Sequence, residues 1–457
     1  MNELEEQNDP DHTEAPVAAP KHILDHSPMN GLQIAAVAIC ILLNALDGFD
    51  VLAISFASPG IAADWGINRA ELGFVLAMEL VGMAFGSISL GGMADKYGRR
   101  PTILLCLALM AAGMYGASLA NSISVLLLFR LLTGIGIGGM LASTNAMTAE
   151  YANAKYRNLA VILMAAGFPI GAIIGGSIST QLLEIYDWRA VFVFGAICTG
   201  FFLLVVWFGL PESIEYLASR RPKNALARIN KTLIRMGHDS LTSLPELKVS
   251  DSNSGSSYNA LFSPKYRSLT LLLIVAYFMH MMTFYYILKW IPKIVVDMGY
   301  QASSAGAVLV WANVGGALGA LSMGVMATRI RLINLLTIML ILSFAMVMVF
   351  GLGHENLTEL SIVAAVTGFC TNAGVVGLYA LLAASFPSDL RASGTGVVIG
   401  LGRGGAALGP VIAGFLFVAG MSEMLVSIVM GAGAAVAAVA IFSLRPALKR
   451  LNVPANI

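Results

Sequence analysis

The chain has 457 residues, of which 57% are hydrophobic and 12% are charged, and its formal net charge is +1. Soluble domains contain about 45–50% apolar and about 25% charged residues, so this composition excludes a soluble globular protein and a disordered chain. The four cysteines lie singly in apolar runs, which excludes a disulfide scaffold and predicts no metal site. The near-neutral charge argues against a nucleic-acid partner. The chain is therefore predicted to be an integral membrane protein in contact with the lipid bilayer.

Twelve apolar segments are each long enough to cross a bilayer as a helix, which takes about 20 residues. A helix satisfies its backbone amides internally, so the predicted fold is all-α and integral to the membrane. The acidic segment 1–33 lacks the basic region and cleavage site of a signal peptide, and is predicted to be a cytoplasmic tail. The predicted spans are 34–62, 72–94, 101–120, 123–147, 158–182, 189–210, 267–291, 304–327, 332–352, 358–385, 392–420 and 422–444.

Basic residues are distributed unevenly between the two sides of this predicted bundle. With both termini in the cytoplasm, 21 of the 27 Lys and Arg residues fall in cytoplasmic loops and tails. Cytoplasmic loops of membrane proteins carry such an excess of Lys and Arg. The chain is therefore predicted to be a multi-pass protein of the bacterial cytoplasmic (inner) membrane with both termini inside the cell.

The spans divide into two six-helix halves, 34–210 and 267–444, and the second half is followed by a cytoplasmic tail, 445–457. The segment GGMADKYGRR (91–100) after the second span has a degraded counterpart, GVMATRIR (324–331), 233 residues later. Two pseudo-symmetric bundles are typical of a transporter whose site lies at the midplane between the halves. We expect it to act as a monomer.

The loop 211–266 joins the halves and is predicted to be a cytoplasmic linker. Pro222 and Gly237 bracket a short amphipathic helix, which we expect to lie as a tether on the inner leaflet. The Ser-rich stretch 250–257 is typical of a flexible connection. The apolar face of the predicted helix comprises Leu226, Ile229, Leu233 and Met236.

GGMADKYGRRP (91–101) resembles the loop signature of the major facilitator superfamily, G-x-x-x-D-[RK]-x-G-R-[RK], at the expected place between the second and third spans. Three further stretches resemble the aromatic acid:proton symporter family within it, namely DGFD (47–50), PESIEYL (211–217) and GLGRGGAALGP (400–410). The resemblance implies proton-driven uptake of an aromatic carboxylate such as 4-hydroxybenzoate, protocatechuate or benzoate.

Ionisable residues inside a membrane are costly and indicate function. Asp47 and Asp50 are spaced i, i+3 on one face of the first span. Two desolvated carboxylates resist carrying two charges, so this pair is predicted to bind and release the coupled proton. Arg130 opens RLLTGIGIGG, which resembles the superfamily's R-x-x-x-G-x-G element, linked there to proton transfer. A structural ion pair of Arg130 with Glu79 or Asp50 is the alternative.

Arg403 lies among closely spaced glycines in the eleventh span, where the backbone can approach a ligand. Its guanidinium offers a bidentate fork to a carboxylate, so Arg403 is the predicted anion site. The alternative is a buried counter-ion to Asp47 or Asp50. Subtracting the repeat offset of 233 from His280 gives Asp47, so we expect these two residues to face each other across the central cavity. A neutral His280 that is hydrogen-bonded inside the helix packing is the alternative.

Rings and amides from the seventh, eighth and tenth spans can hold an aromatic ligand and bind its hydroxyl groups. Ordinary helix packing is the alternative for each of them. The predicted binding residues besides Arg403 and His280 are Tyr277, Phe284, Trp311, Asn372 and Tyr379.

The loop motif also predicts a gate on the cytoplasmic side. Asp95 is expected to interact with the N-terminal end of the eleventh span, and Arg99 to meet Glu150. Arg391, before that span, completes the predicted gate. Thr328 stands where the repeat would place a partner for Asp95, which argues against a symmetric lock.

Other functions remain open from the residues alone. A drug antiporter, a sugar carrier or a transporter of a non-aromatic dicarboxylate such as muconate has the same architecture, and the Arg403 cation favours an anion. A membrane ligand sensor without transport lacks an obvious signalling domain. Motifs for nucleotide hydrolysis, zinc peptidases and nucleophilic hydrolases are absent, so we predict no enzyme activity and no cofactor.

Overall fold

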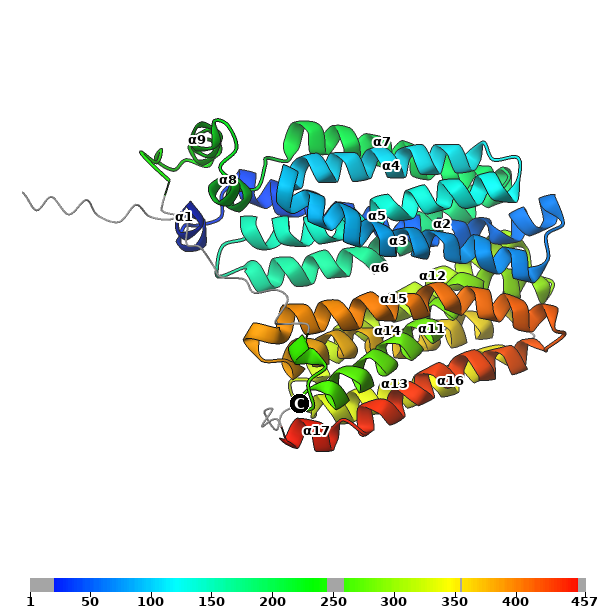
Figure 1. Ribbon diagram of the computed structural model, residues 1–457. Helices are drawn as coiled ribbons and strands as arrows, with labels where there is room; N and C mark the ends of the chain where they lie inside the picture. The colour runs from blue at the N-terminus through cyan, green and yellow to red at the C-terminus, as the bar shows by residue number, and fades with distance from the viewer. Residues whose placement is uncertain (1–19, 245–258, 354–355, 451–457) are drawn as a thin grey trace, which may run out of the picture.

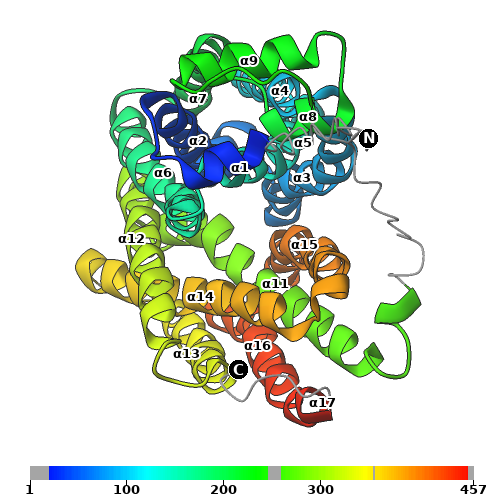
Figure 2. The ribbon, with the colours of Figure 1, turned by 90° about the vertical axis from the view of Figure 1, so that its left-hand side faces the viewer.

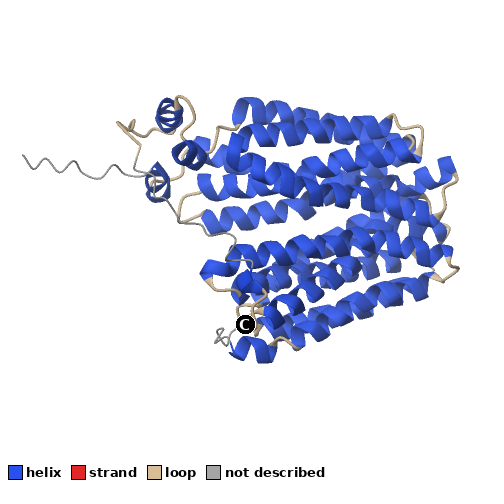
Figure 3. Cartoon of the chain, in the orientation of Figure 1, coloured by secondary structure: helices blue, strands red, loops and turns tan. Residues whose placement is uncertain are grey.

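The computed structural model describes residues 20–244, 259–353 and 356–450, and its regular elements within these ranges are all helices (Figure 3). Twelve of them are long and apolar enough to cross a membrane, as predicted. Their bounds lie within a few residues of the predicted spans, except where a helix continues beyond its apolar stretch. They are α2 (Gly31–Trp65), α3 (Arg69–Tyr97), α4 (Arg99–Ser118), α5 (Ile123–Tyr151), α6 (Arg157–Ile185), α7 (Arg189–Gly209), α11 (Arg267–Asp297), α12 (Ala302–Met326), α13 (Leu332–Gly351), α14 (Leu357–Ser385), α15 (Ser388–Val418) and α16 (Glu423–Phe442).

The twelve helices form two groups of six, α2–α7 and α11–α16 (Figure 1). The main packing partners in the first half are α2 with α6, α3 with α5, and α4 with α7; in the second half they are α11 with α15, α12 with α14, and α13 with α16. Each pair of the first half thus has its counterpart in the second. The two large contacts between the halves are α3 with α15 and α6 with α12. They are also equivalent, because α12 is the counterpart of α3 and α15 is the counterpart of α6. The predicted pseudo-symmetric bundles are confirmed.

Close helix crossings occupy equivalent positions in the two halves. A Cβ at Gly171 of α6 would collide with the carbonyl oxygen of Ala45, and a Cβ at Gly405 of α15 would collide with that of Phe278. Glycine lets two membrane helices approach backbone to backbone. These pairs are separated by 234 and 233 residues, the offset of the loop repeat.

Four short helices gather at the end of the bundle where both described termini lie (Figure 2). We call this end the terminal face and the other end the opposite face. Figure 2 looks onto the terminal face, with α1, α8 and α9 over the first half and α17 beside the second. These helices are α1 (Pro20–His26), α8 (Ile214–Arg220), α9 (Ala225–Arg235) and α17 (Arg445–Arg450).

The predicted amphipathic helix of the linker is α9, but its apolar face does not lie against lipid. Ile229 and Leu233 are fully buried, and Met236 accepts a hydrogen bond through its carbonyl from Asn30 before α2. The predicted tether on the leaflet is therefore corrected to a helix packed on protein. The Ser-rich stretch 250–257 lies outside the described residues.

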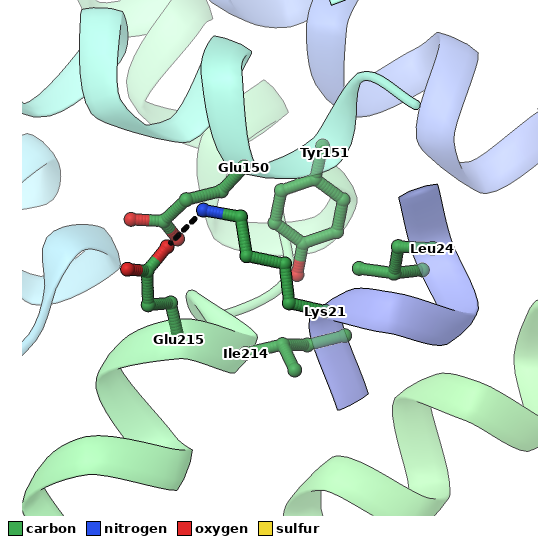
Figure 4. A pocket seen from close by; sticks show the side chains of 6 residues that line it. All are labelled: Lys21, Leu24, Glu150, Tyr151, Ile214 and Glu215. Carbon is green, nitrogen blue, oxygen red and sulfur yellow. Dashed lines mark hydrogen bonds and ion pairs between the residues drawn. The ribbon is translucent and has the colours of Figure 1, made fainter. Parts of the chain in front are cut away.

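The sequence prediction did not anticipate helix α1 within the acidic tail. Asp25 of α1 pairs with Arg157, and Lys21 lies 2.9 Å from Glu215 of α8. Figure 4 shows the small pocket at this junction, which also includes Leu24, Glu150, Tyr151 and Ile214. The ion pair of Lys21 with Glu215 lines this pocket, so we interpret the pocket as part of the contact between α1 and the first half.

Candidate functional site

Four ionisable side chains are buried together inside the first half. Arg130 of α5 pairs with Glu79 of α3 at 2.7 Å, and neither side chain is exposed. Arg130 also donates to the carbonyl oxygen of Asp50 at 3.3 Å and lies over the ring of Phe192. Of the alternatives that the sequence left open, the structure therefore contains the ion pair of Arg130 with Glu79.

Asp47 and Asp50 of α2 are buried at mid-helix beside this pair. Asp47 is 2% exposed, and neither of its carboxylate oxygens has a hydrogen-bond partner among the described residues. Asp50 is fully buried, and one of its oxygens accepts a bond from Thr199 at 3.4 Å. Burying a carboxylate without donors is costly, and a bound proton removes that cost. The arrangement is suited to a group that is neutral in this conformation.

Lys289 of α11 is part of the same cluster, although the sequence analysis did not select it. Its side chain is fully buried and donates to the carbonyl oxygen of Val51 in α2. Its ammonium also lies 3.5 Å from Glu79. Glu79 is thus shared between Arg130 of its own half and Lys289 of the other half.

Arg403 lies with tyrosines where α15 faces α11 and the first half. Its Nη1 donates to the carbonyl oxygen of Met83 in α3 at 3.5 Å. Tyr277 of α11 donates from its hydroxyl to that of Tyr379 of α14 at 3.1 Å. Tyr277 and Tyr285 lie within electrostatic reach of Arg403 and of Tyr379. Tyr379 is 45% exposed. A cation beside partly accessible phenols can bind a carboxylate on a ring.

His280 does not face the interface between the halves, so that expectation is corrected. Its ring is fully buried, and Nε2 lies 2.9 Å from the carbonyl oxygen of Thr371. A Cβ at Gly374 of α14 would meet this ring at 2.6 Å and Leu340 of α13 at 3.3 Å. His280 is thus enclosed by helices of its own half and is not part of the site that we propose.

The other predicted binding residues have varied surroundings. Phe284 is half-buried against Tyr285, with ring centroids 5.4 Å apart, and Trp311 is 52% exposed. Asn372 donates to the carbonyl oxygen of Gly316 at 2.7 Å, which joins α14 to α12. Phe284, Trp311 and Asn372 stay candidates for substrate binding. Asn372 also contributes to the packing of α14 on α12.

His280→Ala is expected to lower the free energy of unfolding by about 2–4 kcal/mol, because it leaves a cavity between α11, α13 and α14. The substrate KM should stay within about twofold of the wild-type value, whereas the loss of a binding contact would raise it by about tenfold. Thermal unfolding in detergent and uptake into vesicles measure the two quantities. A large rise in KM with unchanged stability would restore His280 to the binding site.

One of the contacts expected for the gate is present. Arg99 lies 3.8 Å from Glu150, as expected. Asp95 pairs with Arg99 at 3.0 Å, and its carbonyl oxygen accepts a hydrogen bond from Arg220 at 3.1 Å. Arg391 donates to the carbonyl oxygen of Phe386 at 3.4 Å.

Glu212, in the PESIEYL stretch, organises this region and was missed as a functional residue. Its carboxylate accepts hydrogen bonds from the backbone amides of Arg99 and Arg100 at 2.9 and 3.1 Å, where α4 begins. A carboxylate at a helix N-terminus satisfies unpaired amides and interacts favourably with the helix dipole. Tyr151 donates to the carbonyl oxygen of the same residue at 2.6 Å. Glu212 therefore fixes the loop motif to the end of α5.

Polar contacts between the halves lie toward the opposite face and at mid-depth. At the opposite face, Arg69 of α3 pairs with Asp297 of α11 at 2.7 Å and lies 3.9 Å from Glu423 of α16. Deeper in the bundle, the contacts of Lys289 and Arg403 described above cross the same interface. The halves are thus joined by ion pairs at the opposite face.

Membrane-crossing helices in two related halves, with ionisable groups buried where the halves meet, define a membrane transporter. The profile of the Major Facilitator Superfamily matches residues 40–353 and 273–456. The chain belongs to this superfamily, in the family of aromatic acid transporters that the sequence motifs predicted, and is a transporter and not an enzyme.

Similar proteins support this assignment along the whole chain. A gallate transporter of Pseudomonas putida is 30% identical over 433 residues, which cover 94% of this chain and 96% of its own. The 4-hydroxybenzoate transporter PcaK of Pseudomonas aeruginosa is 30% identical over 91% of this chain and 94% of its own. The fold is similar to that of the xylose transporter XylE from E. coli in a partially occluded inward open conformation, with a TM-score of 0.71, 14% identity, and coverage of 91% of this chain and 98% of that one.

Proposed function

We propose that the protein is a proton-coupled symporter that takes up a small aromatic carboxylate of the 4-hydroxybenzoate, protocatechuate or benzoate class. The observation that carries this proposal is the position of Arg403 within electrostatic reach of Tyr277 and Tyr285, with Tyr379 hydrogen-bonded to Tyr277, at the edge of the interface between the halves. The guanidinium would bind the carboxylate, and the phenols would contact the ring and its hydroxyl groups. The named activities of the relatives, on gallate and 4-hydroxybenzoate, are consistent with this chemistry.

The membrane orientation follows from charge. We assign the terminal face to the cytoplasm of a bacterial cell, because Lys and Arg concentrate in its loops. The ion pairs of Arg69 then close the outer side. Substrate exchange in this conformation would take place on the cytoplasmic side.

Asp47 and Asp50 would carry the coupled proton, and Arg130 would bias their charge state. Arg130 is held on Glu79 at 2.7 Å and touches the backbone of Asp50, so it lies close to the acid pair without an ion pair to either member. A proton taken up outside and released inside would neutralise and recharge this buried group once in each cycle. Asp95, Arg99, Glu150 and Arg391 would form the cytoplasmic gate, with Asp95 interacting with the N-terminal end of α15.

Uptake of labelled aromatic acids into vesicles, with and without an imposed proton gradient, tests the proposed function directly. The panel contains 4-hydroxybenzoate, protocatechuate, benzoate and muconate. Accumulation of the aromatic acids that depends on the gradient supports the proposal. Accumulation of muconate alone would instead indicate a dicarboxylate transporter.

Arg403→Lys is expected to raise the substrate KM by roughly tenfold, because the charge stays while the bidentate fork is lost. The matched control is Arg329→Lys, which changes an exposed arginine in the loop after α12. Concentration-dependent uptake of 4-hydroxybenzoate measures both. An unchanged KM with reduced protein yield would show that Arg403 is a structural counter-ion.

A further inference from the structure

The two halves carry opposite charge in the membrane interior. In α11–α16 the acidic residues Asp297, Glu359, Asp389 and Glu423 all lie within three residues of a helix end. More than four residues from a helix end, the described helices of that half have two cations, Lys289 and Arg403, and no acid. The first half has three interior acids, Asp47, Asp50 and Glu79, and one cation, Arg130.

The two interior cations of the second half use the first half for their hydrogen bonds. Lys289 donates to the carbonyl oxygen of Val51 and contacts Glu79, and Arg403 donates to the carbonyl oxygen of Met83. The hydrogen bonds that the structure describes for both side chains all cross the interface. When α11 and α15 move away from α2 and α3, both cations lose these partners, whereas Glu79 keeps Arg130 at 2.7 Å.

Lys289 and Arg403 differ in depth. At 1.5 Å per residue, Lys289 lies about 12 Å along α11 from its end at the opposite face, and Arg403 about 22 Å along α15 from its corresponding end. Lys289 is thus roughly 10 Å closer to the opposite face. An anion that entered from that face would reach the ammonium before the guanidinium.

We propose that Lys289 is a second carboxylate-binding residue, which receives the anionic substrate when the transporter opens to the opposite face and hands it on to Arg403. This inference rests on the proposed function and names a residue that the sequence motifs do not contain. In the closed arrangement the Glu79 carboxylate and the Val51 carbonyl take the place of the substrate oxygens. Separation of the halves leaves a buried cation without a partner, which costs free energy that a substrate carboxylate recovers. Binding and opening are therefore linked, since each favours the other.

The test compares transport in the two directions. Lys289→Ala is expected to raise the KM for uptake of 4-hydroxybenzoate from the opposite face by at least about tenfold, the scale of one charge-assisted bond. The KM for efflux from the terminal face should change by less than about twofold, because substrate on that side meets Arg403 first. Lys289→Arg should recover most of the uptake affinity. The vesicles are of known orientation and contain the full chain.

Lys293→Ala is the matched control, because it removes a lysine one turn further along α11 that pairs with Asp297 inside that helix. Its uptake KM should match that of the wild type. A Lys289→Ala variant with a lower maximal rate and unchanged KM in both directions would overturn the inference and leave Lys289 as a latch between the halves. Failure of the wild-type chain to transport any of the aromatic acids would refute the proposed function, and the role of Lys289 with it.

Discussion

Asp47→Asn and Asp50→Asn are each expected to abolish the accumulation of substrate driven by a proton gradient, because an amide has no titratable proton. Both side chains are buried, and the ion pairs of the described residues include neither of them. The measurement is the steady-state accumulation of labelled 4-hydroxybenzoate in vesicles that are acidic outside. Uptake by the wild type should rise as the outside pH falls, and the variants should only equilibrate the substrate. The variants should still exchange substrate across the membrane when no proton gradient is imposed.

Asp64→Asn provides the matched control, since Asp64 lies in the same helix, near its end at the opposite face, and pairs with Arg189 at 3.1 Å. Its side chain is 46% exposed, so the substitution changes a surface charge and leaves the buried acids intact. We expect this variant to accumulate substrate normally. Normal accumulation by both Asp47→Asn and Asp50→Asn would exclude the acid pair as the proton carrier.

The architecture was predictable because the membrane restricts which backbone structures can cross it. Each span must be an apolar helix of about 20 residues, so length and hydropathy identify it. The helix ends were less predictable, because helical hydrogen bonding continues past the apolar region into water. Helix α11 shows this clearly, since it continues to Asp297, six residues beyond the predicted span.

This difference in length explains why Lys289 was missed. A lysine near the predicted end of a span is usually interpreted as a residue that reaches the interface. The longer α11 instead places Lys289 two turns inside the helix, and its partners Val51 and Glu79 come from the other half. A single sequence does not show which residues of the two halves face each other, so it could not reveal this contact.

The error about His280 has a different cause. The repeat register was right, because the equivalent contacts of Ala45 and Phe278 are also 233 residues apart. Gly374 of α14 lies close to both His280 and Leu340 of α13, and Asp47 lies within electrostatic reach of Cys106 of α4, the counterpart of Leu340 at an offset of 234. The side chains of His280 and Asp47 therefore lie toward the interior of their own half. Two residues at equivalent positions of a repeat lie on the same face of their helices, but those two faces need not contact each other.

The charges that the sequence could identify one by one thus act as a group that spans the interface. Glu79 is its centre, because it contacts Arg130 and Lys289 and lies within electrostatic reach of Asp47 and Asp50. In this conformation its charge balances a cation from each half. Glu79 is therefore the residue whose loss should disturb both the stability of the first half and its contact with the second.

Glu79→Gln is expected to lower the free energy of unfolding by about 3–5 kcal/mol, because two buried cations would lose their shared counter-ion. Lys289→Gln should cost much less, since Glu79 keeps Arg130 at 2.7 Å and loses only a partner at 3.5 Å. Thermal unfolding of the purified protein in detergent measures both. The matched control is Glu71→Gln in the same helix, where a glutamine can keep the hydrogen bond to the amide of Asn68. A Glu79→Gln variant as stable as Glu71→Gln would mean that Arg130 and Lys289 find other partners, and that the buried charges do not depend on Glu79.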